Sequence, residues 1–275
     1  MTPTGEALGH GFSSLTGNYS IERLKTMANR YFSLLLFLLL ALPALKLQAK
    51  TLTLPPSFFE KTDAFLKKHV REGMVDYAAA ARDQEALKGL LQMVGTADLK
   101  GASASEKKAF FINAYNLLVV GAVLERYPLP SVKEVPGFFD KRTFAVAGER
   151  LTLNDLENKK LREPYQDPRI HFVLVCAAKG CPPLRAGAFL PASVDQQLTE
   201  QTRLALNDPA FVRVNQNKKQ VQVSEIFKWY AADFPAGSQG LISFLNTYRS
   251  APVKENFSIG HYSYDWTLND VRGRK

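Results

Sequence analysis

The segment from Glu106 to Tyr127 constrains the fold of this chain more than any other part of the sequence. Its middle, AFFINAYNLLVVGAVL, is apolar on nearly every side of a helix, which is typical of a helix buried all round. Ser103 and Glu106 have the spacing of a capping box, and Pro128 disfavours helical geometry at the residue before it. The sequence therefore predicts a long core helix.

Other patterns supply both helices and strands to pack around that helix. Helices are expected at 57–70, 84–94, 194–207 and 241–248, with a further one opening at Ser224. Extended segments are expected at His171–Cys176, at 142–153 around Gly148, at a hairpin centred on 216–218, and at 259–266. These elements predict an α+β fold over residues 50–275, a single domain with a modest β-sheet packed by several helices.

The N-terminal 49 residues have the features of an export signal. Ser33–Leu42 is the apolar run SLLLFLLLAL, which follows basic residues and precedes the small residue Ala49. The run is shorter than the about 20 residues that a spanning helix needs. We expect an N-terminal extension and signal peptide over residues 1–49, with translation from Met27 and a retained anchor as open alternatives. A periplasmic or secreted location, with no membrane span after signal removal, follows.

The charge balance is basic but shows no pattern of nucleic-acid binding. The chain has 35 Lys and Arg against 26 Asp and Glu, a formal net charge of +9. The basic residues are scattered among acidic ones and form no stripe or recognition motif, so we expect no nucleic-acid partner. An envelope polymer or protein partner stays open, because a positive surface attracts anionic polymers.

The stretch HFVLVCAAKGCPPL, residues 171–184, holds a histidine and both cysteines of the chain. In a regular strand, His171 and Cys176 point to opposite faces and lie about 16 Å apart along the strand. That geometry argues against a catalytic dyad between them and against a zinc site, which needs four converging ligands. We expect no metal and no cofactor.

The two cysteines leave several roles open. The four residues between Cys176 and Cys181 include Gly180, and such a loop can bring two Cα atoms within disulfide range. In an oxidising compartment a disulfide loop clasp is the simplest expectation. A nucleophilic thiol, two inert buried thiols and a redox-active pair are the alternatives. A nucleophile needs a base within hydrogen-bond reach, and His261 and His171 are the candidates.

Two amides interrupt the apolar core helix. Asn113 and Asn116 are three residues apart and so share one helix face. A buried amide without a partner costs about 1–3 kcal/mol, so these side chains must be hydrogen-bonded. They either fasten the backbone of a neighbouring loop or line a polar cleft that binds a ligand. Tyr115 adds a hydroxyl to such a cleft.

Ordered motifs give the chain a family resemblance. The segments are FFINAYNLLVV, HFVLVCAAKGCPPLR, SEIFKWYAADF and YDWTLND, preceded by VREGMVDYAAAARD. In this order and spacing, over Val70–Asn269, they resemble the domain-of-unknown-function family 547. The resemblance implies a shared fold and, for bacterial members, an export signal. It implies no reaction, substrate or catalytic residue.

Two functions of different class follow from these features. The first is an exported envelope protein of unestablished activity, a binding or scaffolding domain with a polar cleft near Asn113 and Asn116 and a cysteine-containing loop. The alternative is a thiol-dependent hydrolase or acyl transferase acting in the cell envelope. Its candidate catalytic residues are Cys176, Cys181, His171 and His261.

Overall fold

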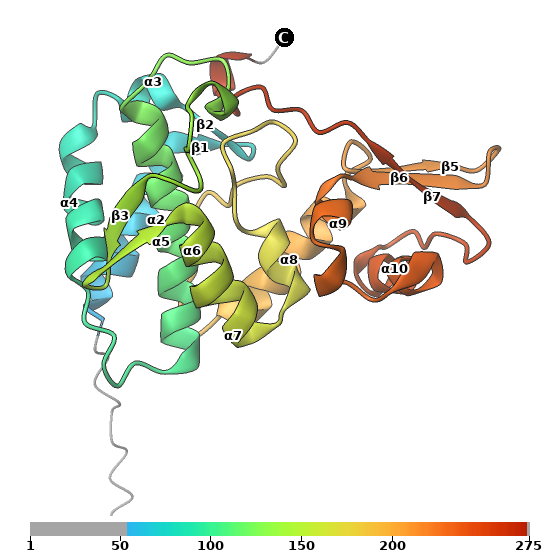
Figure 1. The fold of residues 1–275 in the computed structure, drawn as a ribbon, viewed down its shortest axis with the longest axis horizontal. Coiled ribbons are helices and arrows are strands. Elements are labelled where there is room, and N and C mark those ends of the chain that lie inside the picture. Colours follow the sequence, from blue (N-terminus) through green and yellow to red (C-terminus); the bar gives the residue numbers. More distant parts are fainter. Residues whose placement is uncertain (1–53, 274–275) are drawn as a thin grey trace, which may run out of the picture. The chain divides into compact units, whose positions relative to one another are not determined.

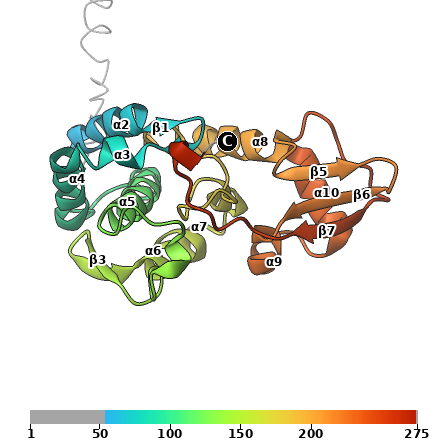
Figure 2. The ribbon, with the colours of Figure 1, turned by 90° about the horizontal axis from the view of Figure 1, so that it is seen from above.

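Helix α5 (Ala104–Leu124) is the axis of the larger hydrophobic core. Residues 109–123 are buried without interruption. The capping box is present, because Ser103 Oγ accepts the Glu106 N–H at 3.3 Å and Glu106 Oε2 accepts the Ser103 N–H at 2.7 Å. Helices α3, α4, α6 and α8 contact α5, and Figure 2 shows α2, α4 and α6 around it. The prediction of a core helix is therefore confirmed.

The computed structural model describes residues 54–273, so the expected signal over residues 1–49 and the alternative start at Met27 lie outside the described residues. The other α-helices are α2 (Pro56–His69), α3 (Tyr77–Ala80), α4 (Gln84–Thr96), α6 (Leu153–Glu157), α7 (Glu163–Tyr165), α8 (Val194–Asn207), α9 (Ile226–Trp229) and α10 (Gly237–Tyr248). Short 3-10 helices are η1 (Val132–Glu134), η3 (Pro168–Phe172), η4 (Ala231–Asp233) and η5 (Val271–Gly273), and η2 (Asn158–Arg162) is a π-helical turn. The strands are β1 (Val70–Arg71), β2 (Met74–Val75), β3 (Thr143–Val146), β4 (Glu149–Thr152), β5 (Val212–Asn215), β6 (Gln220–Ser224) and β7 (Ser258–Tyr262).

The strands form small sheets rather than one large one. Strands β1–β2 and β3–β4 are antiparallel pairs, and β5–β6–β7 is a sheet in which β5 and β6 are antiparallel while β6 and β7 are parallel. A second hydrophobic core, which includes Val221 and Val223 of β6 and Ile242 and Leu245 of α10, belongs to this sheet (Figure 1). Small sheets combined with helices make the fold α+β, as the sequence predicts.

Helix α5 is also long and apolar enough to cross a membrane by length and composition alone. It is the one helix of the described residues that meets this criterion, and 83% of its most apolar window is buried inside the fold. Core helices pass the same test, so length and composition argue only weakly for a span. The burial of α5 is that of a core element.

The strand expected at His171–Cys176 is wrong. Residues up to Phe172 lie in the 3-10 helix η3, and the chain from Val173 to Cys176 is irregular. The apolar side chains are nevertheless buried, since a short apolar run does not distinguish a strand from another buried segment. The Asn116 side chain, rather than a neighbouring strand, pairs with Val173 O and Val175 N. The 16 Å separation of His171 from Cys176 therefore loses its basis.

Two further boundaries differ from the expected ones. The helix opening at Ser224 is only the short α9 followed by η4. The late strand ends at Tyr262, and residues 264–269 instead run beside the 177–180 turn, where Lys179 N–H donates to Thr267 O and Gly180 N–H donates to Asp265 O, both at 2.8 Å. The expected hairpin at 216–218 and the strand pair around Gly148 are confirmed as β5–β6 and β3–β4.

Candidate functional site

A cavity of about 360 Å³ lies where the two hydrophobic cores meet. Trp266, one of its lining residues, packs against both cores. We call it the thiol cavity because Cys176 lines it. Its lining residues are Tyr115, Phe139, Asp140, Asn154, Glu157, His171, Leu174, Cys176, Ile226, Trp229, Tyr230, Tyr264 and Trp266. The volume is at the small end of the range for ligand-binding sites.

His171 is held in the cavity wall by a carboxylate. Its Nε2 lies 2.6 Å from Asp233 Oδ2, and its ring lies 4.1 Å from the ring of Tyr230, centroid to centroid. Burial lowers the pKa of His171 to about 4, although the hydrogen bond to Asp233 acts in the opposite direction. The imidazole is therefore neutral near pH 7. Because an ionised carboxylate only accepts, Nε2 carries the proton and Nδ1 carries the lone pair.

Asp233 is in turn held by Arg162, on the π-helical turn η2. The guanidinium makes a bidentate pair with the carboxylate, Nε to Oδ2 at 2.7 Å and Nη2 to Oδ1 at 2.9 Å. This hydrogen bond, together with the one from His171, keeps the pKa of Asp233 below its ordinary value despite partial burial. Bidentate pairing fixes the carboxylate plane, so Arg162 and Asp233 together fix the orientation of the imidazole.

The two cysteines lie side by side with a tyrosine hydroxyl. The sulfurs of Cys176 and Cys181, both free thiols in the structure, are 2.8 Å apart, and Tyr264 Oη is 3.1 Å from each. The Cys176 N–H also donates to Cys181 Sγ at 3.1 Å. Burial opposes ionisation of Cys181, yet the hydrogen bonds from Cys176 and Tyr264 lower its pKa. The hydrogen bond to Cys181, together with burial, raises the pKa of Cys176.

The turn after Cys176 has a constrained backbone. Ala177 has a φ of 61°, a left-handed conformation that costs a non-glycine residue about 1–2 kcal/mol. A Cβ on Gly180 would lie 2.9 Å from Asp265 N and 3.0 Å from the Tyr264 ring, so only glycine fits there without movement. This close approach lets the segment carrying Tyr264 lie against the turn and bring its hydroxyl to the sulfurs.

A buried carboxylate, Glu157, completes the polar lining. It ends α6 and is 7% exposed. Burial raises its pKa, while hydrogen bonds with the hydroxyls of Tyr230 and Tyr115 and the charge of Arg162 act to lower it. Perturbed carboxyls in cavities are frequent at functional sites.

Asn113 and Asn116 bind the backbone of two loops. Asn113 donates to Phe189 O at 2.8 Å and accepts from Phe189 N at 3.0 Å. Asn116 donates to Val173 O at 2.9 Å and accepts from Val175 N at 3.0 Å. This is the loop-fastening alternative, and neither amide lines the thiol cavity. Tyr115, between them, does line it.

The remaining sequence candidates divide between the cavity and the surface. The structure brings His171, Cys176 and Tyr115 together in the cavity lining. The sulfur of Cys181 lies 2.8 Å from that of Cys176. His261 is exposed on β7 and is not part of the lining. The disulfide between Cys176 and Cys181 stays a prediction.

Sequence reasoning assigned no role at this site to Glu157, Arg162 or Tyr264. A signal for Glu157 exists, because Leu153, Leu156 and Leu161 mark an apolar helix face on which Glu157 also lies. A carboxyl on such a face is expected to be buried. The contacts of Arg162 and Tyr264 are long-range and leave no comparable local pattern.

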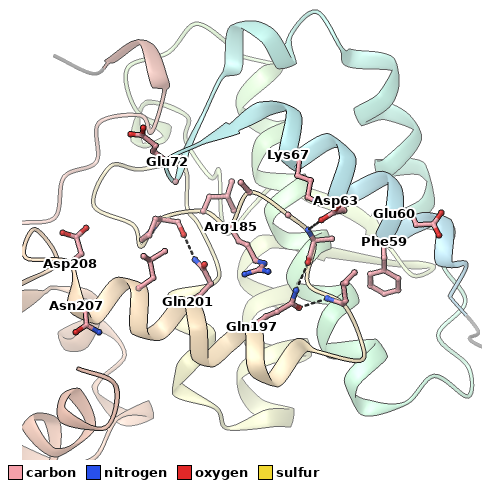
Figure 3. Close-up of a pocket in the computed structure, with 18 of the residues that line it drawn as sticks. Phe59, Glu60, Asp63, Lys67, Glu72, Arg185, Gln197, Gln201, Asn207 and Asp208 are labelled. Atoms are coloured by element: carbon pink, nitrogen blue, oxygen red, sulfur yellow. Dashed lines mark hydrogen bonds and ion pairs between the residues drawn. The ribbon is translucent and has the colours of Figure 1, made fainter. Parts of the chain in front are cut away.

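A larger groove, of about 1110 Å³, lies between α2 and α8 and is drawn in Figure 3. Its polar side chains hold the 183–190 loop: Gln201 donates to Pro183 O at 2.8 Å, Gln197 to Ala188 O at 3.1 Å, and Asp63 accepts from Ala188 N at 3.1 Å. Within the described part of the chain, neither a thiol nor an imidazole lines it. The groove therefore offers less chemistry than the smaller thiol cavity.

No group of three or more His, Cys, Asp and Glu side chains that would suit a metal ion occurs among residues 54–273. Comparison with known proteins finds a similarity over part of the chain. The model of the family described as "Protein of unknown function, DUF547" matches residues 99–204, so this segment is similar to that family. No curated protein and no solved structure matches the chain. The matched region includes Glu157, His171 and both cysteines.

Proposed function

We propose that the protein is a thiol-dependent hydrolase or acyl transferase whose nucleophile is Cys176. One observation carries the proposal: Cys176 and His171 line the same cavity, and Asp233 holds Nε2 of His171 at 2.6 Å. A nucleophile, a base and a group that orients the base are the parts that nucleophilic catalysis requires.

In this reaction, Cys176 Sγ attacks the carbonyl carbon of an acyl substrate and forms a thioester. The thiol proton passes to Nδ1 of neutral His171, which returns it to the leaving group as the old acyl bond breaks. Water or a second nucleophile then attacks the thioester and restores the thiol. Asp233 accepts the hydrogen bond from Nε2–H throughout the reaction and stabilises the imidazolium that forms during proton transfer.

Cys181 and Tyr264 both lie beside this thiol: the hydrogen bond with Cys181 raises the pKa of Cys176, and the hydrogen bond with Tyr264 lowers it. They place two hydrogen-bonding groups within 3.1 Å of the Cys176 sulfur. Cys181 itself is not part of the cavity lining. It therefore acts on the substrate through Cys176 and is a positioning residue in this proposal.

Reaction of the reduced protein with p-nitrophenyl acetate tests the proposal. We expect a burst of p-nitrophenolate and one acetyl group on Cys176 by peptide mass spectrometry. Cys176→Ala removes both, and His171→Gln slows acylation by about 10²–10⁴-fold. His261→Gln is the matched control and leaves the rate unchanged, since His261 is exposed outside the cavity. An unchanged burst in Cys176→Ala, or equal effects of the two histidine substitutions, would overturn the proposal.

Ligand binding without turnover is the second candidate, and it is favoured by the exposed lining residues. Trp229 is 46% exposed, and Asp140 and Asn154 are exposed residues of the same lining. An exposed indole with polar neighbours is a common arrangement in binding sites. Retained ligand binding in a protein that never forms the acetyl adduct favours this candidate.

Export to the periplasm or the medium is part of the proposal. It is supported by the apolar run Ser33–Leu42 and the small residue Ala49. The intact mass of the protein from cell fractions tests it, since removal of residues 1–49 leaves Lys50 at the N-terminus. The full-length mass in the membrane fraction alone would indicate a retained anchor instead.

A further inference from the structure

The thiol cavity combines aromatic rings with acidic groups. Six of its lining residues are aromatic: Tyr115, Phe139, Trp229, Tyr230, Tyr264 and Trp266. Two carboxyl groups, of Glu157 and Asp140, complete its charged lining, and among the described residues no lysine or arginine lines it. The one imidazole, His171, is neutral near pH 7, since burial lowers its pKa. The lining therefore disfavours an anion.

The carboxyl of Glu157 is buried, and the nearby guanidinium of Arg162 does not pair with it directly. The hydrogen bonds of Arg162 go to Asp233 and to Asn158 Oδ1. Glu157 instead interacts with the hydroxyls of Tyr115 and Tyr230. A nearby opposite charge stabilises an ionised carboxylate inside a protein, so a bound cation near Glu157 would offset the desolvation of that group.

The aromatic wall offers a second attraction for a cation. Trp229 and Trp266 are stacked with an interplanar angle of 28° and centroids 5.9 Å apart, and the ring of Tyr264 lies 4.9 Å from each. The faces of these rings carry negative potential. Lys133 Nζ already lies 5.5 Å from the Trp266 ring, and Trp229 leaves nearly half of its surface exposed. Indole faces attract ammonium groups, including quaternary ones.

We infer that the thiol cavity recognises the ammonium group of a small ligand, between the Glu157 carboxylate and the Trp229 indole. The substrate class of the proposed acyl-transfer reaction is then an acyl compound that carries a primary or quaternary ammonium group. Only this second statement rests on the proposed function. A volume of about 360 Å³ fits a small head group rather than a length of polymer.

Choline and 3,3-dimethylbutan-1-ol are the probes, because they have the same shape and differ in charge. Binding to the Cys176→Ala protein is measured by quenching of tryptophan fluorescence and by calorimetry, so that no turnover is needed. We expect choline to bind at least about ten-fold more tightly than the neutral alcohol, a factor that corresponds to about 1.4 kcal/mol. Equal affinity for the two probes, or tighter binding of acetate or glucose, would overturn the inference.

Substitutions locate the site. Glu157→Gln and Trp229→Ala should each weaken choline binding by about ten-fold or more, whereas Glu163→Gln, an exposed carboxyl outside the cavity, should leave it unchanged. If circular dichroism shows that Glu157→Gln is unfolded, Trp229→Ala at its exposed position decides. Unchanged choline binding in Trp229→Ala, or an equal loss in Glu163→Gln, contradicts the inference.

The two proposals fail separately. Charge-selective binding without an acetyl adduct on Cys176 rejects acyl transfer and leaves the ammonium site. An acetyl adduct together with no discrimination between choline and its neutral isostere rejects the ammonium site and leaves acyl transfer.

Discussion

His171 and Asp233 are 62 residues apart in the sequence, and their side chains meet with Nε2 and Oδ2 at 2.6 Å. The imidazole is buried and the carboxylate is about one quarter exposed, so the pair lies between the core and the solvent. Arg162 pairs with the same carboxylate and balances its charge. A neutral base with a fixed tautomer results, and both its pKa and its orientation depend on residues from separate parts of the chain.

The low pKa of His171 predicts a loss of stability in acid. In the unfolded chain His171 binds a proton near pH 6.5, and in the fold only near pH 4, so the unfolded state binds more protons between these values. This contribution to the free energy of unfolding is complete above pH 6.5 and is lost as the pH falls toward 4. Its size is about 3 kcal/mol.

Urea unfolding of the wild-type protein and of His171→Gln across this pH range checks the prediction. The raised pKa of Glu157 contributes with the opposite sign, because the folded state then binds the extra proton. That contribution is common to both proteins and cancels in the difference. The free energies of wild type and variant should diverge as the pH rises from 4 to 6.5, and parallel curves would contradict the prediction.

Removal of either amide of α5 should lower the stability of the fold equally, but only removal of the Asn116 amide should affect the reactivity of Cys176. Asn113→Ala and Asn116→Ala each leave a backbone N–H and a backbone C=O without their partner, which should cost about 2–4 kcal/mol in urea unfolding. Only Asn116 holds the segment that leads into Cys176. Alkylation of Cys176 by iodoacetamide should therefore change in Asn116→Ala and stay the same in Asn113→Ala. Equal alkylation rates in both variants would show that the loop does not need this anchor.

Local patterns in the sequence predict most of the fold, and the site only in part. The sequence signal of α5 is its capping box, and that of α8 is its 3.6-residue apolar period. Both helices form as expected. The apolar run that ends at Cys176 is buried as expected but is no strand, because its backbone pairs with the side chain of Asn116. The pattern of apolar residues in a segment cannot show that a side chain, here that of Asn116, will pair with its backbone in place of a neighbouring strand.

The site depends on contacts that no local pattern encodes. The meeting of His171 with Asp233 and of Tyr264 with the two sulfurs joins segments more than 60 residues apart. Strand geometry placed His171 and Cys176 too far apart for chemistry, and the irregular backbone removes that constraint. Glu157 is the exception, since its position on the apolar face of α6 is visible in the sequence.

The position of the Tyr264 hydroxyl predicts that it makes the thiol pair more acidic. Its hydroxyl lies 3.1 Å from both sulfurs and lowers the pKa of Cys181 together with the hydrogen bond from Cys176. Tyr264→Phe removes one hydrogen bond to the thiolate, so the pKa of the first thiol to ionise should rise. The pH profile of iodoacetamide alkylation of the reduced protein, followed by peptide mapping, measures the shift.

Tyr262→Phe is the matched control for this measurement, because the Tyr262 hydroxyl donates to Phe211 O rather than to a sulfur. The same experiment on protein isolated without reductant tests the expected disulfide. Two thiols that resist alkylation until reductant is added would confirm the Cys176–Cys181 bond, and alkylation of both without reductant would contradict it.

The close approach at Gly180 predicts that a single methyl group perturbs the site. In Gly180→Ala the new Cβ would meet Asp265 N at 2.9 Å and the Tyr264 ring at 3.0 Å, so the segment that carries the hydroxyl must move away from the sulfurs. Overpacking of this kind costs about 1–3 kcal/mol. We expect lower stability in urea unfolding and, as the Tyr264 hydroxyl withdraws, the same rise in thiol pKa as in Tyr264→Phe.

Gly89→Ala on α4 is the control: a Cβ there meets nothing within 4 Å, and the substitution should stabilise the helix by up to about 1 kcal/mol. A Gly180→Ala protein with unchanged stability and an unchanged alkylation profile would show that Tyr264 does not depend on this contact for its position beside the thiols.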